Sequence, residues 1–141
     1  MIKKNFLFFF LLFILISQKL FSEITFYEAG KVFFEKKDFE KAKIKFEQSI
    51  VFNPKNENSY LYLAKIFKIQ AKDSLEEQNL NTVILLNPKN EEALYELALL
   101  KIRKSNYSET EKLINTFKSV CEKMCSKSLE LQNKLKNSLK N

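Results

Sequence analysis

The stretch NPKNENSYLYLA, which begins at Asn53, is echoed by NPKNEEALYELA, which begins at Asn87. An echo at such a fixed interval is typical of a repeat protein, in which each unit buries one face against the next. Both copies place asparagine before proline, and a residue before proline is pushed away from helical angles. The stretch is therefore interpreted as a corner that ends one helix pair. Asn56 and Asn90 are placed to cap the helices that follow it.

The periodicity within each unit is that of amphipathic helices. In rows that begin at Glu23, Glu57 and Glu91, apolar or small residues recur at i, i+3, i+4 and i+7. The first half of row one carries this face on Phe26, Ala29, Gly30 and Phe33. The second half repeats it on Phe39, Ala42, Phe46 and Ile50. Each row therefore predicts two helices of about 14 residues, and their short links favour antiparallel neighbours.

One column of the rows holds only small residues, namely Gly30, Ala64 and Ala98. A close helix crossing needs such a residue, and this contact would offset the roughly 1 kcal/mol that glycine costs inside a helix. Helix starts are indicated as well, because two pairs have the spacing of an N-cap residue and its reciprocal partner. These pairs are Asp73 with Glu76 and Asn106 with Glu109.

The columns resemble the tetratricopeptide repeat (TPR) family. Row one matches the family pattern with Phe26, Ala29, Gly30, Phe33, Ala42, Phe46, Ser49 and Pro54. Row two matches with Tyr60, Leu63, Ala64, Phe67 and Pro88, and row three with Leu94, Leu97, Ala98 and Tyr107. Departures are Glu76 and Thr110 in place of alanine, and Lys101 in place of an aromatic residue. The resemblance implies an all-α solenoid of about three antiparallel hairpins, over 23–56, 57–90 and 91–122.

The segment 123–141 is interpreted as a basic capping helix and tail. A stacked array exposes an apolar face at its last hairpin and needs a cap with a polar outer side. Met124, Leu131, Leu135 and Leu139 fall on one stripe of this segment. A free amphipathic helix that docks on a membrane or a partner is the alternative.

The segment 1–22 has the features of a secretory signal peptide. Lys3 and Lys4 precede an apolar run from Phe6 to Ile16, and a small residue, Ser22, follows near the expected cleavage point. The run is shorter than the ~20 residues that span a bilayer, although an uncleaved inner-membrane anchor is the alternative. We expect export, most simply to the periplasm.

Composition excludes several function classes. The chain has no histidine and one glycine, which removes imidazole chemistry and glycine-rich phosphate loops. We expect no enzyme, no cofactor and no metal site. The formal net charge is +7, but beyond Ser22 the surplus lies in the tail, where five lysines face Glu130 alone. The basic balance therefore does not predict nucleic-acid binding.

Cys121 and Cys125 lie close together in the sequence, where the last hairpin is expected to meet the capping helix. In an exported chain a disulfide is plausible, and a turn between the two would give it acceptable geometry. Two free thiols are the alternative.

A partner-binding groove is predicted on the first helix of each pair, about 100° from the core stripe. The set combines aromatic, aliphatic and basic residues, as a peptide-binding surface requires. Its members are Tyr27, Lys31, Phe34, Leu61, Lys65, Lys68, Tyr95, Leu99, Ile102 and Arg103. The basic members would favour an acidic segment or a terminal carboxylate.

The sequence thus favours an exported, non-enzymatic TPR adaptor that holds a protein or peptide partner in the bacterial cell envelope. A self-assembling structural subunit is the second hypothesis, in which an open end of the array stacks on another copy. A membrane-tethered interaction module that retains the segment 1–22 is the third.

Overall fold

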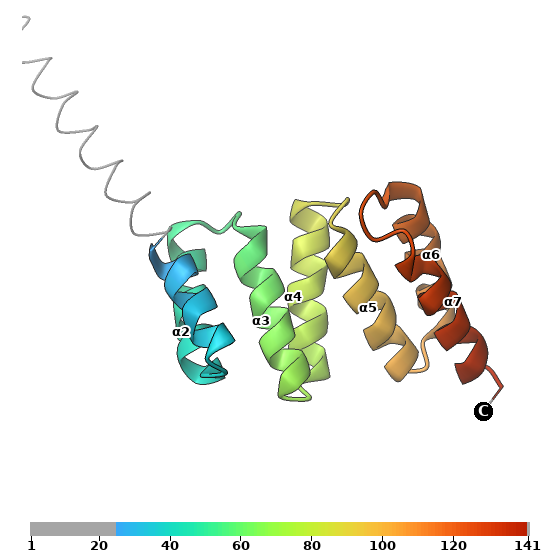
Figure 1. The fold of residues 1–141 in the computed structure, drawn as a ribbon, viewed down its shortest axis with the longest axis horizontal. Helices are drawn as coiled ribbons and strands as arrows, with labels where there is room; N and C mark the ends of the chain where they lie inside the picture. Colours follow the sequence, from blue (N-terminus) through green and yellow to red (C-terminus); the bar gives the residue numbers. More distant parts are fainter. Residues whose placement is uncertain (1–24, 141) are drawn as a thin grey trace, which may run out of the picture. The chain divides into compact units, whose positions relative to one another are not determined.

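The computed structural model describes residues 25–140, and this part of the chain consists of helices joined by short turns, without a strand (Figure 1). Residues 25–35 are helical, and further helices follow: α2 (Phe39–Phe52), α3 (Glu57–Ile69), α4 (Asp73–Leu86), α5 (Glu91–Arg103), α6 (Tyr107–Val120) and α7 (Lys127–Ser138). This all-α helical-repeat fold of the solenoid class confirms the predicted fold class. The predicted signal peptide lies outside the described residues.

The described residues fall into two compact units, which divide between Ser59 and Tyr60. The described part of the first unit holds the 25–35 helix packed on α2. The second unit holds most of α3 together with α4, α5, α6 and α7.

The turn inside each hairpin has the same backbone geometry in every row of the repeat. Lys37, Ala71 and Ser105 all have positive φ, between 54° and 60°. Around each of them the chain forms the two hydrogen bonds of a Schellman motif, in which the residue after the turn donates back to the helix. In each motif one bond spans five residues and measures 2.9 Å. These bonds run from the N–H of Asp38 to the Phe33 carbonyl, from Lys72 to Phe67 and from Asn106 to Lys101. Packing of the hairpin therefore sets this conformation without glycine.

The corners between hairpins lie at the two Asn-Pro stretches, as predicted, and asparagine side chains hydrogen-bond in both of them. Asn53 Oδ1 accepts from the N–H of Lys55 at 3.0 Å, and Asn87 Oδ1 accepts from the N–H of Lys89 at 3.1 Å. Asn90 caps α5 by accepting from the N–H of Ala93 at 2.9 Å. Asn56 accepts from the N–H of Ser59 at 3.3 Å in the equivalent place before α3.

Of the two pairs with N-cap and reciprocal-partner spacing, the prediction for Asp73 and Glu76 is wrong. Asn106 caps α6, as predicted, and its side-chain amide donates to the Glu109 carboxylate at 2.8 Å. Asp73, in contrast, is the first residue of α4, and Lys72 occupies the cap position without a side-chain hydrogen bond. Glu76 turns inward because the helix begins one residue earlier than its spacing suggested.

Gly30 makes the close contact that its column predicted. A Cβ added at Gly30 would lie 2.7 Å from the buried ring of Phe46, which is closer than van der Waals contact allows. The second unit meets the same requirement with alanines. Ala64 packs in one cluster with Leu80, and Ala98 packs in another with Ile114.

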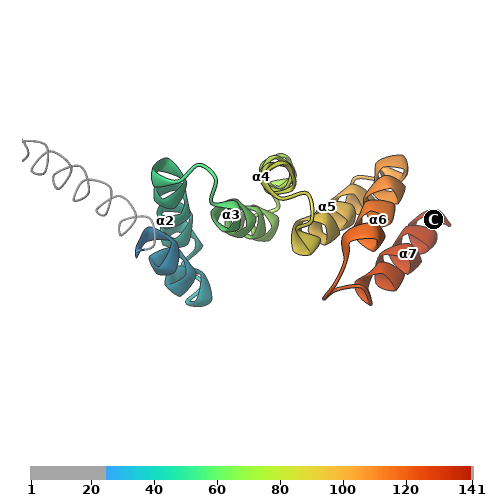
Figure 2. The same cartoon turned by 90° about the horizontal axis from the view of Figure 1, so that it is seen from above.

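Helix α7 packs against both α5 and α6, and the two views show it beside α6 (Figure 1, Figure 2). Its Leu131 is fully buried and Leu135 is 7% exposed, within the cluster that contains Phe117. Tyr107 at the start of α6 donates through its hydroxyl to the Ser138 carbonyl at 3.1 Å. The helix thus covers apolar residues of the last hairpin.

Two departures from the repeat pattern bring charges into the interior. Lys101, in an aromatic column, is buried on α5 and pairs with Glu77 of α4 at 2.6 Å and Glu109 of α6 at 2.7 Å. Glu76, in an alanine column, is 1% exposed and pairs with Arg103 at 2.6 Å. Each ion pair ties α5 to a neighbouring helix, so the departures are compensated locally.

Candidate functional site

The groove residues predicted in the first unit are engaged with their own hairpin. The ring of Tyr27 lies 6.0 Å from that of Phe46, and the ring of Phe34 meets Phe39 edge-on at 5.5 Å. Lys31 pairs with Glu28 at 3.0 Å and lies over the Tyr27 ring. All three predicted residues are half-buried, so each still presents part of its surface.

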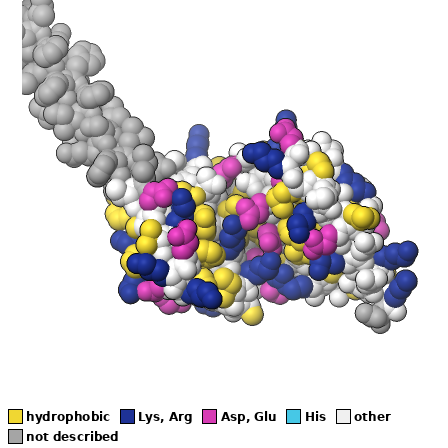
Figure 3. Space-filling view, in the orientation of Figure 1, with side chains coloured by type: hydrophobic (Ala, Val, Ile, Leu, Met, Phe, Trp, Pro, Cys, Tyr) yellow, Lys and Arg dark blue, Asp and Glu magenta, His cyan; other side chains and the backbone are white. Residues whose placement is uncertain are grey.

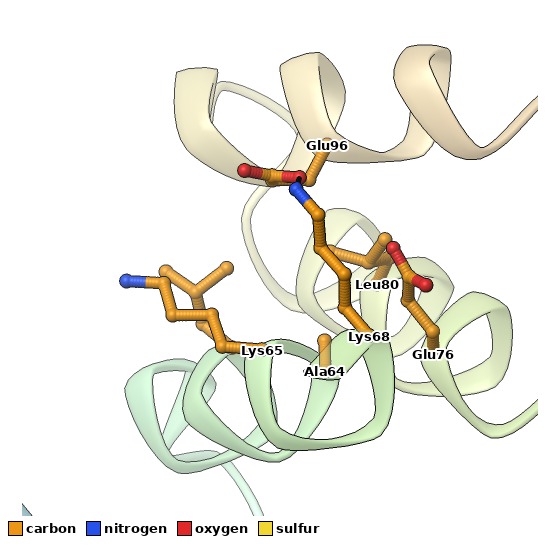
Figure 4. Close-up of a pocket in the computed structure, with 7 residues that line it drawn as sticks. Ala64, Lys65, Lys68, Glu76, Leu80 and Glu96 are labelled. Atoms are coloured by element: carbon orange, nitrogen blue, oxygen red, sulfur yellow. Dashed lines mark hydrogen bonds and ion pairs between the residues drawn. The ribbon is translucent and has the colours of Figure 1, made fainter. Parts of the chain in front are cut away.

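On α3, the predicted residues divide between core and surface. Leu61 is 6% exposed and packs with Leu80 in the core of the second unit, so its side chain is not open to a partner. Lys65 pairs with Glu92 at 2.8 Å. Lys68 extends across to the Glu96 carboxylate on α5, and its ammonium group points away from that of Lys65 (Figure 4).

Beside Lys68 lies a hollow of about 10 Å³, too small for anything beyond a single water molecule (Figure 4). The Glu76 carboxyl group borders it, and its Oε1 is buried without a hydrogen-bond partner. Burial raises the pKa of Glu76, although the Arg103 guanidinium partly opposes this. The hollow is therefore a packing feature and not a ligand pocket.

Tyr95 on α5 is covered by α7. Its hydroxyl donates to Glu130 Oε1 at 2.8 Å, and its ring lies 6.4 Å from that of Phe117. Burial and the hydrogen bond to Glu130 raise the pKa of Tyr95 to about 12. Lys127 lies over the same ring, 5.5 Å from its centroid. Tyr95 thus helps to fasten the last helix, and 9% of its surface remains exposed.

The remaining predicted residues meet in a larger depression of about 460 Å³, which we call the α5–α7 basin. Its floor is aliphatic, because Leu99 and Ile102 of α5 are partly buried against the core. Its complete lining is Lys68 from α3, Leu99, Ile102 and Arg103 from α5, and Lys134, Asn137 and Ser138 from α7. Sequence reasoning missed the α7 residues, since they lie beside the apolar stripe that predicts the capping helix.

Each cation of the basin already has a carboxylate nearby. Lys68 pairs with Glu96, and Arg103 pairs with Glu76 and with Asp73. Lys134 is the most loosely held, 3.8 Å from Glu130. Basic and acidic side chains are likewise interspersed over the face in Figure 3. The apolar floor, and not net positive charge, is therefore what distinguishes this depression.

The loop between α6 and α7 contains a disulfide, one of the two alternatives that the sequence left open. Cys121 ends α6 and occupies the column of Asn53 and Asn87, and its Cα lies 5.2 Å from that of Cys125. A turn separates the two cysteines.

The same loop wraps a carboxylate. Glu91, the first residue of α5, accepts from the backbone N–H groups of Glu122 at 3.0 Å, Lys123 at 3.1 Å and Met124 at 2.6 Å. These bonds, led by those from Lys123 and Glu122, hold the pKa of Glu91 below its usual value. The start of α5 is thereby fixed to the loop that leads into α7.

Among residues 25–140, no group of three or more His, Cys, Asp or Glu side chains could hold a metal ion. Within the same residues, no helix is both long and apolar enough to cross a membrane.

Comparisons with known proteins place the fold. No protein-family model matches the sequence, and no curated protein matches it. Solved structures match instead. The TPR domain of Arabidopsis OM64 is 18% identical, with a TM-score of 0.76 over 84% of this chain and 98% of that one.

Two further matches contain bound partners. The TPR2B domain of yeast Sti1, in its complex with pHsp70, is 16% identical, with a TM-score of 0.74 over 85% of this chain and 98% of that one. The Yersinia enterocolitica secretion chaperone SycD, in complex with a peptide of YopD, is 14% identical, with a TM-score of 0.68 over 82% of this chain and 88% of that one. The chain therefore has a TPR-like fold.

Proposed function

We propose that the chain is an exported, non-enzymatic adaptor that binds a protein or peptide partner in the bacterial cell envelope. The observation that carries this proposal is the α5–α7 basin, a depression that three helices line and whose floor is aliphatic. Apolar side chains in a concave surface are what a helical-repeat protein uses to hold an extended or helical segment. Solved structures with the same fold include complexes with peptides, which supports this use of it.

The basin favours contact through its floor. Leu99 and Ile102 would supply apolar anchors, whereas Lys68 and Arg103 would have to leave intrachain carboxylates to pair with a partner. Lys134, with its carboxylate at 3.8 Å, is the cation best placed to meet an acidic residue. Tyr27, Lys31 and Phe34 of the first unit stay predictions as partner-binding residues.

The test uses site-specific photo-crosslinking in living cells. A photo-reactive amino acid at Ile102 should capture a partner, and the control position is Leu85, which is 81% exposed on α4 outside the basin. Leu99→Ser should reduce the Ile102 crosslink at least about tenfold, because one buried anchor contributes about 1.5–3 kcal/mol. Equal capture from both positions would reject the basin as the binding site.

Export is tested separately by reading the N-terminus of the mature protein. A sequence that begins near Glu23 supports cleavage of the segment 1–22 and a periplasmic location. An intact Met1 in the membrane fraction would favour the tethered alternative.

Self-assembly is a second candidate, because apolar residues are exposed on α7 and at its C-terminal end. Leu129 is 62% exposed and Leu139 is 57% exposed. Sedimentation over a range of concentrations discriminates, since a concentration-independent monomer would exclude it.

A further inference from the structure

The loop at residues 121–126, which leads into α7, is held by a disulfide and by hydrogen bonds to a carboxylate. The Cys121–Cys125 disulfide joins its ends covalently. The Glu91 carboxylate accepts hydrogen bonds from three backbone N–H groups of the loop. The corners at Asn53 and Asn87, which occupy the same repeat column, are closed by hydrogen bonds from an asparagine side chain.

Helix α7 is held in place by contacts outside itself. It has 12 residues, and an isolated helix of that length is marginal in water. Its N-cap residue, Ser126, makes no side-chain capping bond. The N-terminal half of α7 is therefore held by the loop, by Leu131 and by the hydrogen bond from Tyr95 to Glu130.

The same helix forms one wall of the α5–α7 basin, through Lys134, Asn137 and Ser138. Movement of α7 would therefore change the basin directly. The corners at Asn53 and Asn87 contain no cysteine, so a change of redox state cannot act on them.

The disulfide is accessible from outside. Cys125 is exposed, whereas Cys121 is half-buried against the cluster that contains Phe117. A reductant can therefore approach the Sγ of Cys125, which is the sulfur that a thiolate attacks most readily when access decides.

We propose that the Cys121–Cys125 bond is a redox switch that controls the docking of α7 and, through it, the shape of the α5–α7 basin. A thiolate of a dithiol reductant attacks Cys125 Sγ, the bond to Cys121 Sγ breaks, and Cys121 leaves as a thiolate. The second thiolate of the reductant then attacks the mixed disulfide and releases Cys125. The reductant becomes a disulfide, and both cysteines gain a proton and one electron each.

Reduction removes the covalent closure and leaves Glu91 as the remaining constraint on the loop. The expected loosening of α7 follows from the contacts of the loop. Only the expected change in partner binding rests on the proposed function.

Hydrogen–deuterium exchange on the full chain tests the switch without any partner. Amides of α7 should exchange at least about tenfold faster after treatment with dithiothreitol, because a short cross-linked loop gains many conformations when it opens. Amides of α3 and α4 should keep their rates. The mass gain of two hydrogens confirms that reduction is complete.

Two variants make the test specific. Cys121→Ser/Cys125→Ser should exchange in α7 at the fast rate and show no response to dithiothreitol. Glu91→Gln keeps the disulfide, and its α7 should exchange slowly until dithiothreitol is added. Unchanged α7 exchange after complete reduction would overturn the switch, and so would equal acceleration in all helices, which indicates global unfolding.

The basin arm repeats the crosslinking from Ile102 in the Cys121→Ser/Cys125→Ser variant. Loss of the crosslink together with fast α7 exchange supports control of the basin. A retained crosslink with fast α7 exchange overturns that part. If no crosslink forms even in the oxidised protein, the proposed function fails while the exchange result still stands.

Discussion

The first hairpin (residues 25–52) and the last hairpin (α5 and α6) occupy equivalent columns of the repeat with different chemistry. Gly30 receives the ring of Phe46 in the first, and Ala98 packs in one cluster with the smaller Ile114 in the last. A smaller residue on one helix is matched by a larger one on the other. The columns therefore conserve the combined volume of a pair and not the identity of either member.

The ends of the two hairpins differ in the same way. Asn53 closes the first corner through its side chain, and Cys121 closes the last through a disulfide. Phe33 fills its column with a ring in the first hairpin, whereas Lys101 fills it with an ion-paired chain in the last. The repeat thus dictates backbone geometry and space, and several chemical solutions satisfy it.

The largest expected effect on stability comes from removing α7, which covers the last hairpin. Truncation after Cys121 deletes α7 and exposes Tyr95, Ala98 and Phe117. Loss of buried Leu131 and Leu135 costs about 1.5–3 kcal/mol each. The melting temperature should fall by more than about 10 °C, measured by circular dichroism. Truncation after Ser138, which keeps α7, is the control, and equal melting curves for the two would contradict the capping role.

The matching of a small residue with a large one is tested by giving the first hairpin the pair found between α3 and α4. Gly30→Ala should destabilise by about 2 kcal/mol, because overpacking against the Phe46 ring outweighs the gain in helix propensity. In the Phe46→Leu background, where the pair becomes that of Ala64 and Leu80, the same change should cost at least about 1 kcal/mol less. Denaturant unfolding of all four proteins measures the coupling, and additive effects would argue against it.

The ion-paired column gives a smaller effect. Lys101→Met should cost about 1 kcal/mol at neutral pH, because Glu77 keeps Lys104 and Glu109 keeps Asn106 as partners.

The pH dependence of this variant has a defined sign. Lys101 and Lys104 hold the pKa of Glu77 below its usual value, so the wild type gains stability from it above that usual value. The gain is lost as the pH falls through the lowered pKa. Lys101→Met should therefore lose less stability between pH 7 and acid than the wild type, as followed by unfolding at several pH values. A parallel pH dependence would show that the pair contributes nothing.

The smallest expected change in stability comes from the N-terminus of α4, where the N-cap residue makes no side-chain hydrogen bond. Asp38 accepts from the N–H of Lys41 and Asn106 from that of Glu109, whereas Lys72 in the same column makes no such bond. Lys72→Asn should stabilise by about 0.5–1 kcal/mol by accepting from the N–H of Leu75. Lys72→Ala is the matched control, and an equal gain from both would mean that removal of the lysine, and not capping, is responsible.

Much of this architecture could be predicted from the sequence. Helix pairs, corners at the prolines, the close contact at Gly30 and the caps at Asn90 and Asn106 all follow from local rules that act within a few residues or one repeat. The predicted cap at Asp73 is wrong because the repeat register, which places Lys72 in the column of Asp38, outweighs a favourable local spacing.

The groove was the least predictable part. Helical periodicity placed Leu61 and Tyr95 on a partner face, but the structure buries Leu61 in the core and covers Tyr95 with α7. Angle around a helix does not say which neighbouring helix will approach that side. The α7 residues of the basin, and the carboxylates that neutralise its cations, lie on other helices and could not be read from α3 and α5.

The repeat length, the hairpins and the positions of the small residues can be read from the sequence, because they depend on periodicity and on contacts at a fixed interval. The pairing of the lysines, the open depression and the contacts of the loop at residues 121–126 are defined only in the folded chain. Those features depend on distances between side chains far apart in the chain, which the packing of the helices sets.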